Sequence, residues 1–294
     1  MPIFIPRYIS FAYYIIILKH YCYIPFYLLF CYAIAAYGQA IYTLPSSNTI
    51  ADIQTPRTDT WTAFHNPASL VQDSHTFQVA AQYENRYMLA ALNTASVQAA
   101  YSNPYVNVGV SFSFFGYSKY QEMMAGITLA RSFGRFSLGL QGNYITVYCG
   151  DELKYRGTFI PQAGATMDIS SRLTMGLHIF NPFWQKIHIE EGINRVLPII
   201  YSVGTDYRFT GNLRWAVQAD YDVRSTYRVA TALEWQAIDL LVIKAGVYYR
   251  QQLVGCMGIG ITWDKLRFDA HFELNPTLGV TCQGRVSYAW SCVR

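Results

Sequence analysis

The sequence has few charged residues for its length, and no long apolar run beyond its first 40 residues. Only 14% of its 294 residues are charged, whereas about 25% is usual for a globular domain. Hydrophobic residues make up 52% of the chain and aromatic residues 16%, including 25 tyrosines. Because no later segment could cross a bilayer as a helix, a closed β-barrel is the alternative that satisfies every backbone hydrogen bond in lipid.

Motifs of enzymes, metal sites and nucleic-acid-binding proteins are also missing. The chain has no G-x-S-x-G nucleophile motif, and its six cysteines form no C-x-x-C pair. His188 lies near Glu190 and Glu191, which is more typical of a solvated, charged turn than of a metal site. The net charge of +4 is not concentrated in any basic run. We therefore expect no catalysis, no cofactor and no nucleic-acid partner.

The first 40 residues have the pattern of a secretory signal. Arg7 and Lys19 precede an apolar stretch of 16 residues, 21–36, and small residues follow up to Ala40. A membrane-spanning helix needs about 20 residues, so this stretch is too short to be one. We predict cleavage after Ala40, with residues 33–35 as a second possible site, and export of the mature chain into the periplasm.

From residue 76 to residue 290, apolar and polar residues alternate with a period of two. Leu266 and Phe268, for example, fall on one face of a strand, and Arg267 and Asp269 fall on the other. A helix would mix these sets, whereas a strand separates them. The pattern predicts about fourteen strands, and twelve to sixteen are compatible with it. The segments are 76–85, 94–102, 105–115, 120–131, 134–148, 157–168, 172–181, 196–208, 212–223, 226–236, 239–250, 254–264, 266–275 and 278–290.

The connections between these segments differ in length according to their order. Links after even-numbered segments are short, as at 102–104 and 264–265, whereas links 86–93, 149–156 and 181–195 are long. Bacterial outer-membrane barrels have short periplasmic turns and longer outside loops. The pattern therefore predicts that both ends of the mature chain lie in the periplasm.

Four tryptophans would lie at the periplasmic ends of strands, on the apolar face. Aromatic side chains collect at membrane–water boundaries, whereas a soluble β-sandwich has no reason to sort them by strand direction. We therefore predict an all-β fold: an antiparallel transmembrane β-barrel, residues 76–290, in the outer-membrane lipid of a Gram-negative bacterium. Residues 291–294 would form a C-terminal extension. The four residues are Trp215, Trp235, Trp263 and Trp290.

A barrel of this size has a lumen that must hold water or a plug. Residues 41–75 alternate little and are the candidate N-terminal plug. The polar strand faces would line the lumen, either as a hydrated wall of cross-strand ion pairs or as a polar path with docking sites for the plug. These lumen-facing residues are Arg214, Asp220, Arg228, Glu234, Lys244, Arg267, Asp269, His271, Glu273 and Arg285.

One motif of the candidate plug, Asn66-Pro67-Ala68, has two interpretations. Asparagine before proline can cap a short helix. An Asn-Pro-Ala segment followed by about fourteen amphipathic strands also resembles the long-chain fatty-acid transporter family (FadL-type), together with related type IX secretion barrels (PorV/PorQ-like). In the transporters this segment belongs to a hatch inside the barrel, so the resemblance implies that role for Asn66, Pro67 and Ala68. Here Ser69 stands where the family has glycine.

Two functional hypotheses follow. The first is a FadL-like channel for small hydrophobic molecules, in which Pro161 and Pro198 would mark a break in the wall. The alternative is a non-transport interaction barrel, a scaffold or shuttle in an outer-membrane secretion or assembly complex such as type IX secretion. In that case Phe183, Trp184 and Ile187 would form an exposed, partner-binding loop.

Overall fold

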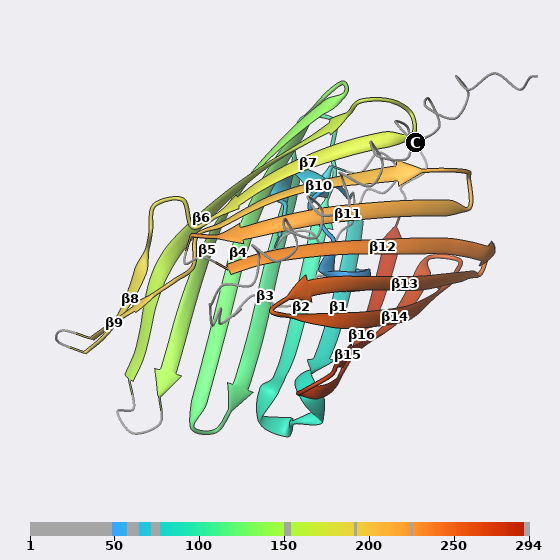
Figure 1. Ribbon diagram of the computed structural model, residues 1–294. Helices are drawn as coiled ribbons and strands as arrows, with labels where there is room; N and C mark the ends of the chain where they lie inside the picture. Colours follow the sequence, from blue (N-terminus) through green and yellow to red (C-terminus); the bar gives the residue numbers. More distant parts are fainter. Residues whose placement is uncertain are drawn as a thin grey trace, which may run out of the picture. The chain divides into compact units, whose positions relative to one another are not determined.

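The computed structural model describes residues 49–57, 65–71, 77–149, 154–190, 193–223 and 226–290 (Figure 1). The expected signal, residues 1–40, and the expected extension, residues 291–294, lie outside the described residues. Within the described residues, no helix has the length and apolar character needed to cross a membrane.

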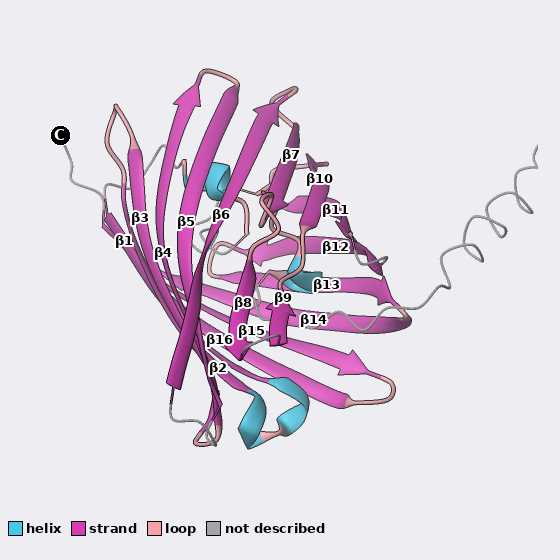
Figure 2. Cartoon of the chain, turned by 90° about the vertical axis from the view of Figure 1, so that its left-hand side faces the viewer, coloured by secondary structure: helices cyan, strands magenta, loops and turns pink. Residues whose placement is uncertain are grey.

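Fourteen antiparallel strands form a closed barrel, which confirms the predicted fold (Figures 1 and 2). Strands that are consecutive in the ring pair with each other, and β1 closes the ring against β16. The barrel strands are β1 (Phe77–Asn85), β2 (Asn93–Tyr101), β3 (Asn107–Tyr117), β4 (Tyr120–Phe133), β5 (Phe136–Cys149), β6 (Lys154–Asp168), β7 (Leu173–Phe180), β10 (Ile200–Arg208), β11 (Leu213–Asp222), β12 (Thr226–Ile238), β13 (Leu241–Arg250), β14 (Gln252–Trp263), β15 (Leu266–Asn275) and β16 (Gly279–Trp290).

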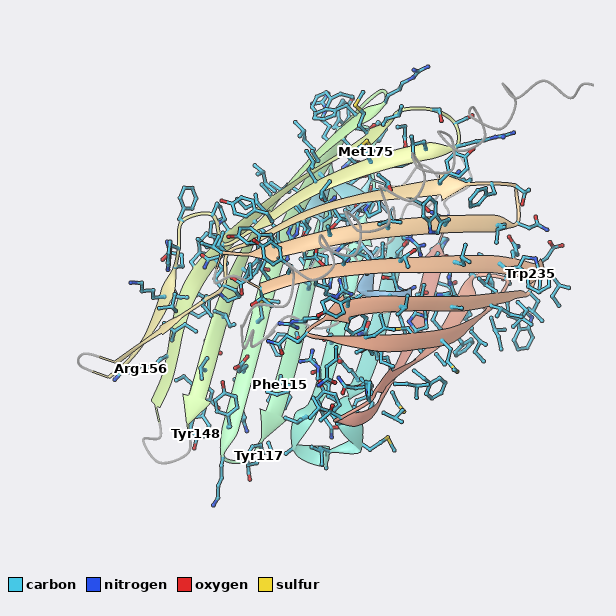
Figure 3. All side chains as sticks on the ribbon, in the orientation of Figure 1. Phe115, Tyr117, Tyr148, Arg156, Met175 and Trp235 are labelled. Carbon is cyan, nitrogen blue, oxygen red and sulfur yellow. The ribbon has the colours of Figure 1, made fainter. Side chains whose placement is uncertain are left out.

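The period-two pattern gives each strand an apolar outer face and a largely polar inner face. In β12, Tyr227 and Val229 are exposed outside the barrel, whereas Arg228 and Ala230 are buried inside it. This arrangement inverts that of a soluble protein, because large apolar side chains are exposed while polar ones such as Gln98 are buried. Figure 3 shows the outward side chains along the whole wall.

The two ends of the barrel differ in their connections. At the short-turn end the links are brief, and both Phe77 and Trp290 lie there. The long-loop end carries η4 (Arg86–Met88), η5 (Ala90–Leu92) and the connection from β7 to β10. All four predicted tryptophans are exposed near the short-turn ends of their strands. In Figure 3, Trp235 lies at this end, whereas Tyr117 and Tyr148 lie at the other.

The connection between β7 and β10 contains a hairpin that the sequence analysis missed. Strands β8 (Lys186–Glu190) and β9 (Ile193–Val196) pair only with each other. The predicted start of a strand at residue 196 is therefore wrong: residue 196 ends β9, and Pro198, which has no N–H for a ladder, lies in the link before β10.

The expected exposure of Ile187 is also wrong. Ile187 is fully buried in an apolar cluster with Phe180 and Leu197, because β8 presents it to the interior. Phe183 and Trp184, by contrast, are 72% and 51% exposed. The loop therefore offers two of its three predicted contact residues to a partner.

Candidate functional site: the inner wall and the N-terminal segment

The described parts of the candidate plug lie against the inner wall of the barrel. We call residues 49–57 and 65–71 the N-terminal segment; it includes η1 (Ile50–Asp52) and η3 (Pro67–Leu70). Two apolar clusters join it to the wall. They are Ile50, Ala51 and Ile53 with Ala216, Ala230, Ala232, Val254 and Cys256, and Leu70 with Ala100 and Ala130. Most of the wall residues in these contacts are alanines, which leave space for the segment.

The Asn66-Pro67-Ala68 motif forms a capped turn that is completely buried. The Asn66 Oδ1 accepts a hydrogen bond of 3.1 Å from the Ala68 N–H, and Pro67 takes the first position of η3. The other end of the amide is also used, because Asn66 Nδ2 donates to the carbonyl oxygens of Thr55 (2.6 Å) and Ala165 (3.5 Å). One side chain thus joins both parts of the N-terminal segment to β6.

Glycines on the inner wall make this close approach possible. A Cβ atom on Gly164 would overlap Asn66 Oδ1, and one on Gly139 would overlap the backbone between Pro67 and Ala68. A Cβ on Gly176 would overlap the Thr55 carbonyl in the same way. These glycines occupy inward positions of β5, β6 and β7. Glycine at inward positions of neighbouring strands is a sequence pattern that indicates close backbone approach, and this contact surface was not predicted from it.

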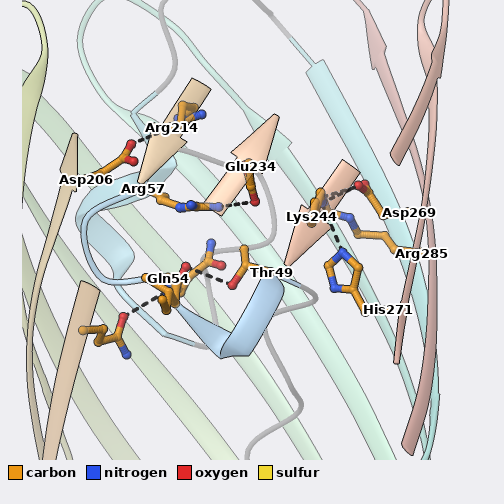
Figure 4. A network of polar contacts seen from close by, with 12 residues as sticks. Thr49, Gln54, Arg57, Asp206, Arg214, Glu234, Lys244, Asp269, His271 and Arg285 are labelled. Carbon is orange, nitrogen blue, oxygen red and sulfur yellow. Dashed lines mark hydrogen bonds and ion pairs between the residues drawn. The ribbon is translucent and has the colours of Figure 1, made fainter. Parts of the chain in front are cut away.

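Polar contacts hold residues 49–57 to β11 and β12, which follow β7 and β10 in the ring. The backbone N–H groups of Gln54 and Thr55 both donate to Gln218 Oε1 at 2.9 Å. The guanidinium of Arg57 forms a buried ion pair with Glu234 on β12 (Figure 4). Glu234 is one of the predicted lumen residues, whereas Arg57 and Gln218 were not predicted to take part in this contact.

A second contact involves the predicted pair Asp220 and Arg228, which are cross-strand neighbours on β11 and β12. Arg228 Nη1 binds Asp220 at 2.7 Å, and Arg228 Nη2 donates to the carbonyl oxygen of Ala51. The same guanidinium lies over the ring of Tyr248, 4.9 Å from its centroid. Arg228 therefore connects the N-terminal segment with three wall strands.

Three of the predicted lumen cations converge on one carboxylate, Asp269 of β15, and Figure 4 shows two of them, Lys244 and Arg285. The N–O distances to Asp269 are 2.7 Å from Lys244, 2.9 Å from Arg267 and 3.0 Å from Arg285. Lys244 Nζ also lies 3.1 Å from His271 Nε2. The carboxylate is fully buried, so several charge-assisted bonds are needed to offset its lost hydration.

The other predicted lumen residues lie on either side of this group. Arg214 pairs with Asp206 near the short-turn end. Toward the long-loop end, Glu273 accepts hydrogen bonds from Tyr248 (3.1 Å) and Gln283 (3.4 Å). All ten predicted residues thus lie on inner strand faces, and most of them are joined in pairs or clusters.

An ion pair also orders the turn that follows β1. Arg86 of η4 binds Glu84 at 2.7 Å. Burial alone would lower the pKa of Arg86, but the neighbouring Glu84 carboxylate more than offsets this and raises the pKa above its ordinary value. The guanidinium is therefore charged at every physiological pH.

The inner wall near the long-loop end is apolar where β4, β5 and β6 meet the β7–β10 connection. Side chains from strands distant in sequence pack together here, and the hairpin residue Ile187 joins them. The cluster contains Met124, Ile145, Val147, Ile160, Phe180, Ile187, Leu197 and Ile200. An apolar environment inside the barrel is therefore limited to this part of the wall and to the contacts of the N-terminal segment, among the described residues.

The pairing of β6 with β7 ends close to this cluster. Its last paired residues are Gln162 and Phe180, followed by a hydrogen bond of 3.1 Å from the Asn181 N–H to the Pro161 carbonyl. From Lys154 to Pro161, β6 pairs with β5 but not with β7. Pro161 thus lies where the pairing of β6 with β7 ends, although β6 itself continues without a break from Lys154 to Asp168.

On the outer surface, the same region of the wall is hollowed. The hollow has a volume of about 650 Å³ and spans β5, β6, β7, β10, β11 and β12. Its outward side chains are almost all apolar or aromatic: Leu138, Ala163, Ala165, Leu177, Ile179, Tyr201, Val203, Ala219, Tyr221, Tyr227 and Val229. Gly164, which contacts Asn66 on the inner side of the wall, is among the residues that line this hollow.

Comparisons with known proteins give the fold. No family model matches the chain, and no curated protein matches it. Among solved structures, it resembles the CymD monoaromatic hydrocarbon channel (TM-score 0.65, 10% identity, 86% of this chain and 100% of that chain). This chain shares the fold of that channel. A FadL homologue from Pseudomonas aeruginosa (0.58, 14%, 86% and 100%) and the toluene transporter TodX from P. putida (0.59, 9%, 86% and 99%) are similar too.

Proposed function

We propose that this chain is an outer-membrane channel that passes small hydrophobic molecules, with residues 41–75 acting as a hatch in its lumen. The barrel's apolar outer face with tryptophans at one rim suits a bilayer. The observation that carries the proposal is the outer hollow beside the place where β6 stops pairing with β7. Lateral passage there would let an apolar molecule avoid the charged part of the lumen.

The arrangement of apolar and polar surfaces supports such a route. A hydrophobic molecule entering at the long-loop end would meet the cluster around Ile160 and Phe180 before it met the charged wall of β11 to β16. Burying about 150 Å² of apolar surface contributes roughly 4 kcal/mol, and breaking a buried ion pair would cost about 3–5 kcal/mol, which is enough to cancel that contribution. The molecule would therefore leave through the wall near Pro161 rather than continue along the lumen.

Filling the hollow tests this proposal. Ala163 lies on its floor and faces outward, so Ala163→Trp should occupy the hollow without touching the N-terminal segment. Uptake of a labelled hydrophobic probe such as toluene, in cells expressing the variant, should fall by about ten-fold or more. Ile259→Trp is the control, because Ile259 is exposed on the outer face of β14, a strand that does not line the hollow. Equal uptake by both variants would remove the proposed route.

A further inference from the structure

Glu234 is the wall residue to which Arg57 of the N-terminal segment is bound, and it has a cation as direct neighbour on both sides. Arg214 on β11 and Lys244 on β13 are the cross-strand partners of Glu234 in the barrel register. Side chains at such positions normally meet, since their Cβ atoms are about 5 Å apart. Both cations nevertheless bind other carboxylates, Arg214 that of Asp206 and Lys244 that of Asp269.

Two glycines on β14 explain how Lys244 reaches past its neighbouring strand. Gly258 lies opposite Lys244, and a Cβ there would overlap the ring of His271; a Cβ on Gly260 would lie 2.7 Å from Asp269 Oδ1. The inner face of β14 is therefore open at this height. The ammonium group crosses it to bind Asp269 on β15, and Glu234 is left to accept Arg57 (Figure 4).

Of the two neighbouring cations, Lys244 could move to Glu234 at a lower cost in free energy than Arg214. If Lys244 left Asp269, that carboxylate would keep its bonds to Arg267 and Arg285. If Arg214 left, the buried Asp206 would lose the partner with which it forms an ion pair. An uncompensated buried carboxylate is strongly unfavourable, so the choice of cation matters.

We propose that Lys244 and Glu234 form an exchange latch: when Arg57 withdraws, Lys244 moves from Asp269 to Glu234 and neutralises it. This inference rests on the proposed hatch, because it makes residues 49–57 a part that leaves the wall and returns. If Arg57 never left Glu234, a second cation able to replace it at that carboxylate would have no role. The latch instead lowers the free energy of the released state and leaves the bound state unchanged.

Amide hydrogen exchange in the full-length protein, in lipid nanodiscs, would test the latch directly. The N–H groups of Gln54 and Thr55 are suitable reporters, since both are bonded to Gln218 and can exchange only when the segment leaves the wall. Lys244→Met should slow their exchange by about ten-fold, because the bound state loses only one of the three cations on Asp269, whereas the released state loses the cation that replaces Arg57 at Glu234. Glu234→Gln should accelerate it by a similar factor, because the bound state loses its ion pair with Arg57.

The sign of the Lys244→Met effect separates the latch from a merely structural network. A network that only supports the wall would be weakened by this substitution, and exchange would become faster or stay the same. Either result would overturn the proposal. Lys265→Met is the matched control, because it removes a cation from the exposed turn between β14 and β15 without changing the neighbours of Glu234 or Asp269, and it should leave the rate within about two-fold. Lys244→Arg should restore the wild-type rate.

These experiments distinguish the latch from the transport function. Exchange is measured without any transported molecule, so a barrel that fails to take up hydrophobic probes could still show the slow exchange of Lys244→Met. Each variant is first tested for the heat-dependent gel mobility of a folded barrel. If Lys244→Met does not fold, Lys244→Gln is measured in its place, with the same expected direction.

Discussion

The Gly164→Ala substitution probes whether the N-terminal segment closes the lumen. Gly164 faces inward on β6, and the added methyl group would overlap the Asn66 side-chain oxygen. The strand itself can accept alanine, because its backbone conformation is extended. The perturbation is therefore confined to the contact between the wall and the Asn66-Pro67-Ala68 turn.

The expected magnitude follows from the bonds that Asn66 would lose. Moving its amide breaks the hydrogen bond from the Ala68 N–H and those to the carbonyls of Thr55 and Ala165. A helix cap contributes about 1 kcal/mol, and the two other bonds together contribute about 1–2 kcal/mol. The total of about 2–3 kcal/mol would raise the released population by roughly 30- to 150-fold.

Conductance of single barrels in planar lipid bilayers would measure this change. If the segment closes the lumen, Gly164→Ala should open to ions far more often than the wild type, by a factor near the one derived above. Gly284→Ala is the matched control, since Gly284 lies on β16 and no atom lies within 4 Å of the added Cβ. The midpoint of barrel unfolding in urea should not change in Gly284→Ala, and the free energy of unfolding of Gly164→Ala should fall by no more than the loss of about 2–3 kcal/mol derived above.

Equal opening frequencies for Gly164→Ala and Gly284→Ala would refute the reasoning. They would mean either that the Asn66 turn does not hold the segment or that the segment does not block the lumen. A large fall in the urea midpoint of Gly164→Ala alone would point instead to damage of the wall.

Two further predictions concern the outer face and the long-loop end. Ile127→Arg places a charge at the middle of the outer face of β4, and it should reduce the free energy of barrel folding into lipid vesicles, measured in urea, by about 2–4 kcal/mol. Leu278→Arg, in the turn before β16, should reduce it by only about 0–1 kcal/mol. Equal losses in the two variants would contradict a bilayer around the barrel. If the chain is a scaffold, affinity purification in mild detergent should recover a partner protein with the wild type but not with the Phe183→Ser, Trp184→Ser double variant. If the wild type is recovered without any partner, that result counts against the scaffold alternative.

The strands were predictable because a two-residue period is a local property of each segment. The pattern at Leu266 to Asn275, for example, required no knowledge of neighbouring strands, and β15 has those bounds. The hairpin β8–β9 was missed because its few residues lie inside a connection that was interpreted as a single loop. Strand parity alone also identified which charged side chains face inward.

The partners of these side chains could not be predicted from parity. Register alone would join Lys244 to Glu234, whereas the structure joins Lys244 to Asp269 across Gly258. The contribution of Arg57 was hidden for a different reason. It lies in a segment without a regular period, so no pattern relates it to a position on the wall.

If the chain is the proposed channel, the placement of small, charged and apolar residues on the inner wall divides its lumen between two tasks. Glycines and alanines occur where the N-terminal segment lies close to the wall, and charged residues of β11 and β12 hold that segment. The large apolar residues gather instead near Phe180, where the wall pairing changes. Charged wall residues suit an N-terminal segment that must block the lumen and yet leave the wall, because the charges can exchange partners when it leaves. An apolar patch suits a passing hydrophobic molecule, which gains nothing from charges. The separation of these two surfaces would let one barrel stay closed to ions while it remains open to hydrophobic molecules.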